Sequence, residues 1–379
     1  MGALRFFLVA GEPSGDKLGA ALMASLRSLA PGCSFQGIGG PLMAAEGLAS
    51  IFPIEELSVI GIAEVLPKYF ALKRRIAQTA AAVLAAAPAA APAALITIDS
   101  PDFCLRVAAI VKAANPAQKT IHYVAPSVWA WRPGRAARMA RVIDHVLALL
   151  PFEPPYMTAA GMSCDFVGHP VVNDPVASPA ERASLANGPR PLILCLPGSR
   201  KSEVTRLAPA FGAALGRLQQ TCPGLGVALP TLSHLAPLLR SLTQSWPVCP
   251  RLILDAAEKR AAFAMADLAL AASGTVSLEL AANQVPMVIA YDMHRVSWWL
   301  MDRMALIDTY TLVNLVSETR AVPEFIGPAC KPAAIAAALT AVLHDSTQQH
   351  AAMSLTMQRL GRGGEPPGLR AARSILAHL

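Results

Sequence analysis

The chain has 379 residues, of which 54% are hydrophobic, 15% charged and 6% aromatic. A chain this long and apolar buries enough surface to offset its conformational entropy, which excludes disorder as its main state. The 32 basic and 25 acidic residues leave a net charge of +7. That charge favours an anionic partner, such as a nucleotide, a phospholipid or a nucleic acid.

The cysteines and one uncharged stretch indicate the class of protein. The seven cysteines are scattered and include no C-x-x-C pair, which argues against a disulfide framework or zinc ribbon and for a reducing compartment. The apolar run 6–10 is too short for a signal peptide. Residues 79–98 carry no charge, but two prolines interrupt them, so we predict a helix, a turn and a buried strand there instead of a membrane span.

Short apolar runs alternate with helical stretches along the whole chain. The expected strands of the first half are 5–10, 95–98, 120–124 and 146–150; those of the second half are 192–196, 226–229, 251–254, 268–272 and 286–290. Stretches such as 17–29 and 207–219 carry Ala and Leu at helical spacing. This alternation is typical of α/β folds, so we predict two doubly wound domains, each built on its own parallel sheet.

A segment rich in Pro, Asn and Gly at 166–191 divides the two sets of strands. We therefore predict a first domain at 1–170, a second at 171–345 and a helical tail at 346–379. The tail is broken by Gly and Pro at 361–367. We expect its last part to pack against the first domain or against a second protomer, which leaves a homodimer open.

Three turns after predicted strands are candidate ligand sites, because backbone N–H groups and the helix dipole face such turns. The first follows strand 5–10 and matches neither a Walker loop nor G-x-G-x-x-G; its candidate residues are Gly11, Ser14, Gly15 and Asp16. The other two follow strands 192–196 and 268–272; their candidates are Gly198, Ser199, Arg200, Ser273, Gly274, Thr275 and Glu279. The alternatives are tight turns, helix N-caps and a solvated basic surface. Two such turns in one domain favour nucleotide binding, with cations and hydroxyls on a diphosphate and Glu279 on a ribose.

Asp99 is the candidate general base, because it ends an apolar strand where doubly wound sheets place catalytic groups. The alternative is that Asp99 or Ser100 caps the following helix, although Asp102 is the better cap of the two acids. The sequence contains no H-E-x-x-H and no D-x-D, so we expect no metal and no other cofactor.

Two stretches combine aromatic and basic residues as interfacial helices do. Their candidate membrane or acyl-chain contacts are Leu66, Tyr69, Phe70, Leu72, Trp298 and Trp299. Core-facing amphipathic helices explain both stretches equally well. Arg132, Arg135, Arg138 and Arg141 recur every three residues and cover about half of a helix, which indicates a solvated face. We expect no nucleic-acid partner.

Taken together, these motifs resemble the lipid-A-disaccharide synthases, a family of inverting glycosyltransferases with the GT-B fold. The resemblance runs nearly end to end and rests on the segments 10–16, 55–61, 98–103, 122–132, 150–153, 167–170, 196–200, 272–275 and 313–315. The stretch HYVAPSVWAWR at 122–132 is the most specific. Pro13 stands where the family usually has Ala, and Val313 where it often has Pro.

The resemblance implies two Rossmann-like domains that face a central cleft. It implies transfer of a sugar from UDP-2,3-diacylglucosamine to 2,3-diacylglucosamine 1-phosphate (lipid X), with Asp99 as base and Asn314 near the nucleotide. It also implies work at the anionic, cytoplasmic face of the inner membrane. Two alternatives stay open: a UDP-N-acetylglucosamine epimerase or transferase to another lipid, and a membrane-binding protein regulated by nucleotide.

Overall fold

The computed structural model describes residues 4–57, 65–85 and 92–379 of the chain. It consists of two compact units, 1–170 with 363–379 and 171–362. Each unit contains one six-stranded sheet, and every paired strand runs parallel to its neighbours. The predicted pair of doubly wound α/β domains is confirmed.

Unit 1 has the strand order β2-β1-β3-β4-β5-β6. Its strands are β1 (Arg5–Ala10), β2 (Ser34–Ile38), β3 (Ala94–Ile98), β4 (Thr120–Tyr123), β5 (His145–Ala148) and β6 (Ser163–Phe166). Its helices are α1 (Pro13–Leu29), α2 (Pro41–Ala45), α3 (Val65–Leu84), α4 (Pro101–Ala114), α5 (Gly134–Met139), α6 (Pro154–Thr158) and α16 (Pro367–Ala377).

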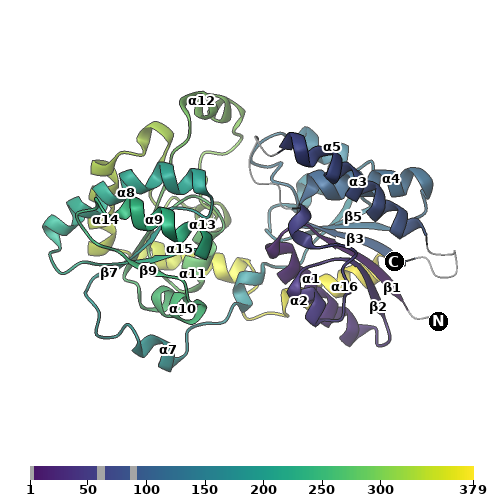
Figure 1. The fold of residues 1–379 in the computed structure, drawn as a ribbon, viewed down its shortest axis with the longest axis horizontal. Coiled ribbons are helices and arrows are strands. Elements are labelled where there is room, and N and C mark those ends of the chain that lie inside the picture. The colour runs from purple at the N-terminus through teal and green to yellow at the C-terminus, as the bar shows by residue number, and fades with distance from the viewer. Residues whose placement is uncertain (1–3, 58–64, 86–91) are drawn as a thin grey trace. The chain divides into compact units, whose positions relative to one another are not determined.

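The alternation of side chains along β1 builds a core on each face of this sheet. Phe7 and Val9 pack with residues of α3, α4 and α5. Phe6 and Leu8 pack with residues of α1 and α16 on the opposite face. Figure 1 shows these two sets of helices on opposite sides of the strands. Because both faces are covered, the strands read as continuous apolar runs in the sequence.

Unit 2 has the strand order β12-β11-β10-β7-β8-β9. Its strands are β7 (Leu192–Leu196), β8 (Gly226–Pro230), β9 (Arg251–Ile253), β10 (Leu268–Ala271), β11 (Met287–Tyr291) and β12 (Glu324–Ile326). Its helices are α7 (Pro179–Ala183), α8 (Lys201–Thr221), α9 (Ala236–Thr243), α10 (Ala256–Met265), α11 (Val276–Ala282), α12 (Arg295–Met304), α13 (Leu312–Ser317), α14 (Pro332–His344) and α15 (Thr347–Arg359). Residues of α8, α9 and α14 share one apolar core with β7.

The C-terminal segment divides between the two units. Helix α15 packs on α11 and α13 within unit 2, whereas α16 packs on α1 within unit 1. The return to unit 1 therefore begins at residue 363, within the Gly- and Pro-rich breaker 361–367, and not at 346 where we placed the start of the tail. The reason is that Ala352, Met353 and Met357 of α15 are buried within unit 2.

The uncharged stretch 79–98 divides as expected where it is described. Helix α3 ends at Leu84 and strand β3 begins at Ala94, while the residues around Pro88 lie outside the described ranges. Among the described helices, none has both the length and the apolar character needed to span a bilayer.

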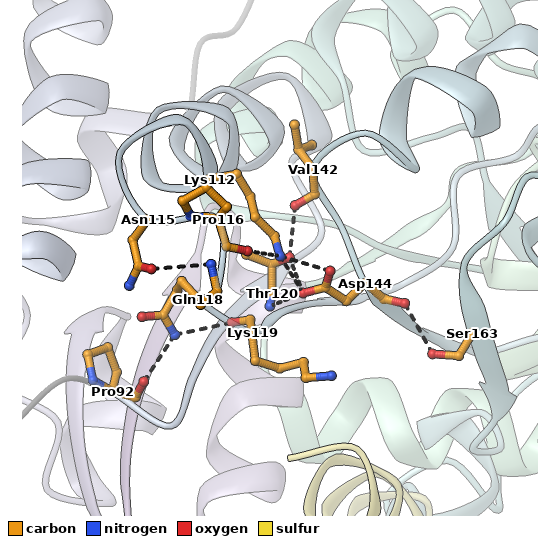
Figure 2. A network of polar contacts seen from close by, with 11 residues as sticks. Pro92, Lys112, Asn115, Pro116, Gln118, Lys119, Thr120, Val142, Asp144 and Ser163 are labelled. Carbon is orange, nitrogen blue, oxygen red and sulfur yellow. Dashed lines mark hydrogen bonds and ion pairs between the residues drawn. The ribbon is translucent and has the colours of Figure 1, made fainter. Parts of the chain in front are cut away.

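A partly buried polar network fixes α4 to the strands beside it (Figure 2). The Asp144 carboxylate accepts hydrogen bonds from Lys112 Nζ at 2.8 Å and from the Thr120 backbone N–H at 2.8 Å. The Thr120 hydroxyl also donates to the Val142 carbonyl at 2.8 Å. Burial favours the neutral acid, but hydrogen bonds from Lys112 and Thr120 outweigh it and hold the pKa of Asp144 below its usual value. The network therefore stays charged over the physiological range of pH.

Candidate functional site

The strand order of unit 2 reverses between β7 and β10, and a crevice of about 460 Å³ opens beyond them. The register pairs Leu196 with Ala271, so the turns after these two strands begin side by side. Open parallel sheets bind ligands at this kind of reversal, outside the carboxyl ends of the strands. The reversal in unit 2 is therefore its candidate ligand site.

Both turns predicted to bind nucleotide line this crevice. Its walls include Gly198, Ser199, Arg200, Ser273, Gly274, Thr275 and Glu279. Residues that are 80 positions apart in the sequence thus meet in one site. Hydroxyl groups, a guanidinium and a carboxylate around a single crevice suit a polar, anionic ligand.

A carboxylate organises the first of these turns. Glu203 Oε2 accepts the backbone N–H groups of Ser199 at 3.2 Å and Arg200 at 3.3 Å. Gly198 has φ 111°, and a Cβ there would lie 2.6 Å from the same oxygen, so the turn requires glycine. Because Glu203 occupies these N–H groups, the exposed Arg200 side chain and the Ser199 hydroxyl are the groups that this turn offers to a ligand.

Several wall residues of the crevice were not predicted from the sequence, and three of them can contact a ligand through a charged, aromatic or hydroxyl side chain. Lys259 and Phe263 come from α10, and Thr231 follows β8. Lys259 Nζ lies 2.9 Å from Glu279 Oε2 and 5.2 Å from the centre of the Phe263 ring. No local motif marks these residues, since α10 reaches the crevice only through the packing of unit 2.

Asn314 does not line the crevice, which corrects its predicted place at the nucleotide. Its side chain is 1% exposed and donates to the Thr309 hydroxyl and the Val322 carbonyl, while its oxygen accepts the Val322 N–H. The neighbouring Tyr310 carbonyl accepts a hydrogen bond from Ser273 Oγ at 3.3 Å. The Asn314 amide therefore stabilises the loop next to the crevice, because both its nitrogen and its oxygen are hydrogen-bonded within the protein.

Unit 1 also reverses its strand order, between β1 and β3, and Asp99 lies at that point. The register pairs Ala10 with Ile98, so the first turn of the chain begins beside Asp99. Ser14 Oγ lies 3.5 Å from Asp99 Oδ2, and the other carboxylate oxygen accepts the Ser100 N–H at 2.8 Å. The fold thus brings the predicted site residues Ser14 and Asp99 together.

The backbone at Asp99 and Ser100 is strained. Their φ angles are 55° and 44°, in the left-handed region that L residues seldom occupy. Such strain costs on the order of 1 kcal/mol or more per residue and persists mainly at functional sites. The Ser100 side chain makes no cap hydrogen bond to α4. The alternative that Ser100 caps this helix is therefore wrong.

Packing accounts for the other residues of the first turn. A Cβ at Gly11 would lie 2.2 Å from Ser100 Oγ, and one at Gly15 would lie 3.3 Å from the Ile98 carbonyl. Asp16 is 3% exposed, and its carboxylate accepts three N–H groups at the start of α2, from Gly40, Leu42 and Met43. The prediction that Asp16 contacts a ligand is corrected, because its carboxylate holds α2 against α1.

A second buried carboxylate links the loops after β4 and β5. Glu153 accepts hydrogen bonds from the Leu149 and Leu150 N–H groups and from Trp129 Nε1. Burial raises the pKa of Glu153 to about 7, and these hydrogen bonds only partly oppose the rise. Trp129 and Glu153 belong to two of the segments on which the family resemblance rests, and the structure gives them a shared structural role.

The predicted membrane contacts differ in exposure. Phe70 is 77% exposed and Trp299 is 54% exposed. Leu72 packs on the core of unit 1, and Trp298 is half-buried against Gly327. The side chains of Leu66 and Tyr69 lie outside the described part of the chain. Leu72 and Trp298 thus pack partly on the protein, and their contact with a membrane or acyl chain stays a prediction.

Within the described ranges, His145, Asp165 and His378 bring three possible metal ligands within 4.8 Å of one another. The two imidazole rings stack face to face, with centres 3.8 Å apart. A metal must lie in the plane of each ring that binds it, which stacked rings do not allow for one ion. Ser374 Oγ instead bridges His145 and Asp165, at 2.7 Å from each, so the cluster secures α16.

Comparisons with known proteins agree with this fold. The chain resembles a putative UDP-N-acetylglucosamine 2-epimerase from Listeria monocytogenes with a TM-score of 0.65 at 13% identity, covering 99% of this chain and 95% of that one. It resembles MurG of Acinetobacter baumannii with a TM-score of 0.56 at 14% identity, covering all of both chains. These likenesses support the GT-B class of fold.

The sequence comparisons are more specific. The family model for lipid-A-disaccharide synthetase matches residues 6–367. The lipid-A-disaccharide synthase of Ruegeria pomeroyi is 60% identical over 99% of this chain and 96% of its own length. That of Rhodospirillum centenum is 46% identical over 99% of this chain and 95% of its own length. The chain therefore belongs to the lipid-A-disaccharide synthase family.

Proposed function

We propose that this chain transfers 2,3-diacylglucosamine from UDP-2,3-diacylglucosamine to the 6-hydroxyl of 2,3-diacylglucosamine 1-phosphate. The products are the β-1,6-linked disaccharide 1-phosphate and UDP. The observation that carries the proposal is the crevice at the reversal of the second sheet, where two polar turns and Arg200 converge in a chain of this family.

The donor diphosphate would bind in this crevice. Arg200 is 72% exposed along its side chain, and its guanidinium can donate two parallel hydrogen bonds to phosphate oxygens. The Ser199 hydroxyl and the turn from Ser273 to Thr275 supply further donors beside it. Glu279 and Lys259 pair at the edge of the crevice, where Glu279 can accept hydrogen bonds from a ribose diol.

Asp99 would act as the general base. Its carboxylate takes the proton of the acceptor 6-hydroxyl while that oxygen forms a bond to the anomeric carbon of the donor. The bond from the anomeric carbon to the diphosphate breaks, and UDP leaves with the electron pair. Attack from the face opposite UDP inverts the anomeric centre. Ser14 donates toward Asp99 Oδ2 and would help to orient the carboxylate.

Charge on the leaving diphosphate would be stabilised by Arg200 and the crevice hydroxyls without a divalent ion. The acidic side chains of the crevice already have partners, since Glu203 accepts the Ser199 and Arg200 N–H groups and Glu279 pairs with Lys259. Chelation of divalent ions by EDTA should therefore leave UDP release unchanged.

Because both proposed substrates are lipids, the protein would associate peripherally with the anionic, cytoplasmic face of the inner membrane. The exposed Phe70 and Trp299 support this proposal, because exposed aromatic side chains partition into the headgroup region of a bilayer. Arg303 lies over the Trp299 ring at 4.1 Å and would add attraction to anionic lipid.

The test is UDP release in detergent micelles from UDP-2,3-diacylglucosamine in the presence and absence of the acceptor. We expect UDP release that requires the acceptor and is matched by disaccharide formation. Consumption of UDP-N-acetylglucosamine without an acceptor would favour the epimerase alternative. Binding of UDP-2,3-diacylglucosamine without any turnover would favour a regulated membrane-binding protein.

A further inference from the structure

A groove of about 510 Å³ runs along unit 1 and includes Pro101 and Asp102, which follow Asp99 closely in the chain. One wall is the beginning of α4, and the other is the segment from Arg132 to Val142, which includes α5. Four arginines line it: Arg106, Arg132, Arg135 and Arg138. We call this feature the arginine groove. Apolar side chains, including the buried Met139, complete its lining.

The charge of the arginine groove is not neutralised by the protein. In the part of the chain that the structure describes, no ion pair involves any of the four arginines. Asp102 is the one described carboxylate that lines the groove. Several guanidinium groups around one concavity repel one another, so an anion bound among them is stabilised.

The Trp131 ring restrains two of the four guanidinium groups. Those of Arg132 and Arg135 lie 4.2 and 5.4 Å from the centre of the Trp131 ring. Cation–π contacts of this kind restrict long side chains that would otherwise move freely in solvent. Arg132 also has φ 52°, a strained conformation for a residue with a long side chain. The sequence alone indicated a solvated face, because the contribution of Arg106 from another helix was not visible.

Polar contacts anchor both walls of the groove to neighbouring parts of the sheet. The Lys112–Asp144 pair holds α4 to the start of β5, and the Thr120 hydroxyl binds the carbonyl of Val142, a groove residue (Figure 2). A site with fixed walls loses little entropy when a ligand binds.

One end of the arginine groove lies at the start of α4, close to Asp99 in the chain. Asp99 and Ser100 lead directly into Pro101 and Asp102, the groove residues at the start of α4. The residues at one end of the groove therefore follow Asp99 by two and three positions in the chain, within the same unit. Guanidinium groups match phosphate in shape and charge, since their planar N–H donors can bind two oxygens at once.

We propose that the arginine groove binds the phosphate monoester of the acceptor and thereby orients the acceptor hydroxyl toward Asp99, an inference that rests on the proposed function. The headgroups of membrane phospholipids offer similar phosphate chemistry. The acceptor is favoured because the groove begins two residues after Asp99, the proposed base to which the acceptor must deliver its proton.

The kinetic test compares the acceptor 1-phosphate with the same diacylglucosamine lacking the phosphate. We expect Arg135→Gln with Arg138→Gln to raise KM for the phosphorylated acceptor about tenfold or more, as the loss of charge-assisted hydrogen bonds predicts. Turnover of the unphosphorylated acceptor and KM for the UDP-sugar should not change. Arg141→Gln is the matched control, because Arg141 continues the same series but does not line the groove.

Equal losses for both acceptors would contradict the role of the groove while leaving the proposed function intact. Absence of UDP release by the unmodified chain with either acceptor would instead contradict the proposed function. A loss of sedimentation with phosphatidylglycerol vesicles in the double variant, with unchanged acceptor selectivity, would assign the groove to the membrane and overturn the inference.

A binding measurement does not depend on turnover. Glucosamine 1-phosphate should raise the melting temperature of the unmodified chain and of Arg141→Gln more than glucosamine does, since a ligand stabilises the state that it binds. The double variant should lose this difference. An unchanged difference in the double variant would overturn the inference whatever the catalytic result.

Discussion

The two sheets reverse their strand order in the same way, yet they place different charged groups at the reversal. In unit 1 the residue at this point is Asp99, held on a strained backbone. In unit 2 the reversal opens into a crevice lined by Arg200 and Lys259. The same topology thus places a carboxylate at the reversal in one domain and the Arg200–Glu203 and Lys259–Glu279 pairs there in the other. The fold determines where a site lies, and the turn residues determine its chemistry.

Removing the acid should have the largest effect. We expect Asp99→Asn to lower turnover by about 10²–10⁴-fold, the usual contribution of general-base catalysis. Binding of the UDP-sugar, measured by calorimetry, should be unchanged, because the donor groups belong to unit 2. Near-normal turnover of this variant would remove Asp99 as the base and abolish the contrast between the two reversals.

The buried carboxyl group of Glu153, in the loop after β5, should make the free energy of unfolding depend on pH. The folded-state pKa of Glu153 is raised from 4.5 to about 7 by burial. Between these values the folded protein keeps a proton that the unfolded chain has lost. The contribution of Glu153 to stability is thus full below pH 4.5 and falls, by roughly 3 kcal/mol, as the pH rises to 7.

Glu153→Gln should remove this contribution. The difference between the unfolding free energies of the unmodified chain and the variant, measured with urea, should therefore change across pH 4.5–7. Burial also lowers the pKa of His145 to about 4, so His145 affects the pH dependence of unfolding. This effect is the same in both proteins and cancels from the difference. A difference independent of pH would mean that Glu153 is not held in its neutral form.

Removing the Arg200 charge from the crevice should have the smallest effect of the three substitutions. We expect Arg200→Gln to lower kcat/KM for the UDP-sugar about tenfold, the cost of one charge-assisted hydrogen bond, with KM for the acceptor unchanged. The neighbouring Lys201→Gln is the control, since Lys201 does not line the crevice. An effect of Arg200→Gln on acceptor KM alone would contradict the division of roles between the units.

Strand prediction succeeded where strands are buried on both faces. The apolar runs expected at 5–10 and 192–196 coincide with β1 and β7. Strands β2, β6 and β12 were not predicted. Each lies at the edge of a sheet and carries polar or partly exposed residues, so it lacks the continuous apolar run that marks a central parallel strand.

The two α/β domains, the family and the strand-end turns can be predicted from the chain alone, because apolar runs and glycine turns are local signals. The contacts of the polar residues depend on how the chain packs. Asp16 and Asn314 looked like ligand contacts, but folding buried both among backbone groups. Conversely, folding brought Arg106 to Arg132, and Lys259 to Glu279, from separate elements. Burial and distant contacts depend on how helices pack, which no short stretch of sequence records.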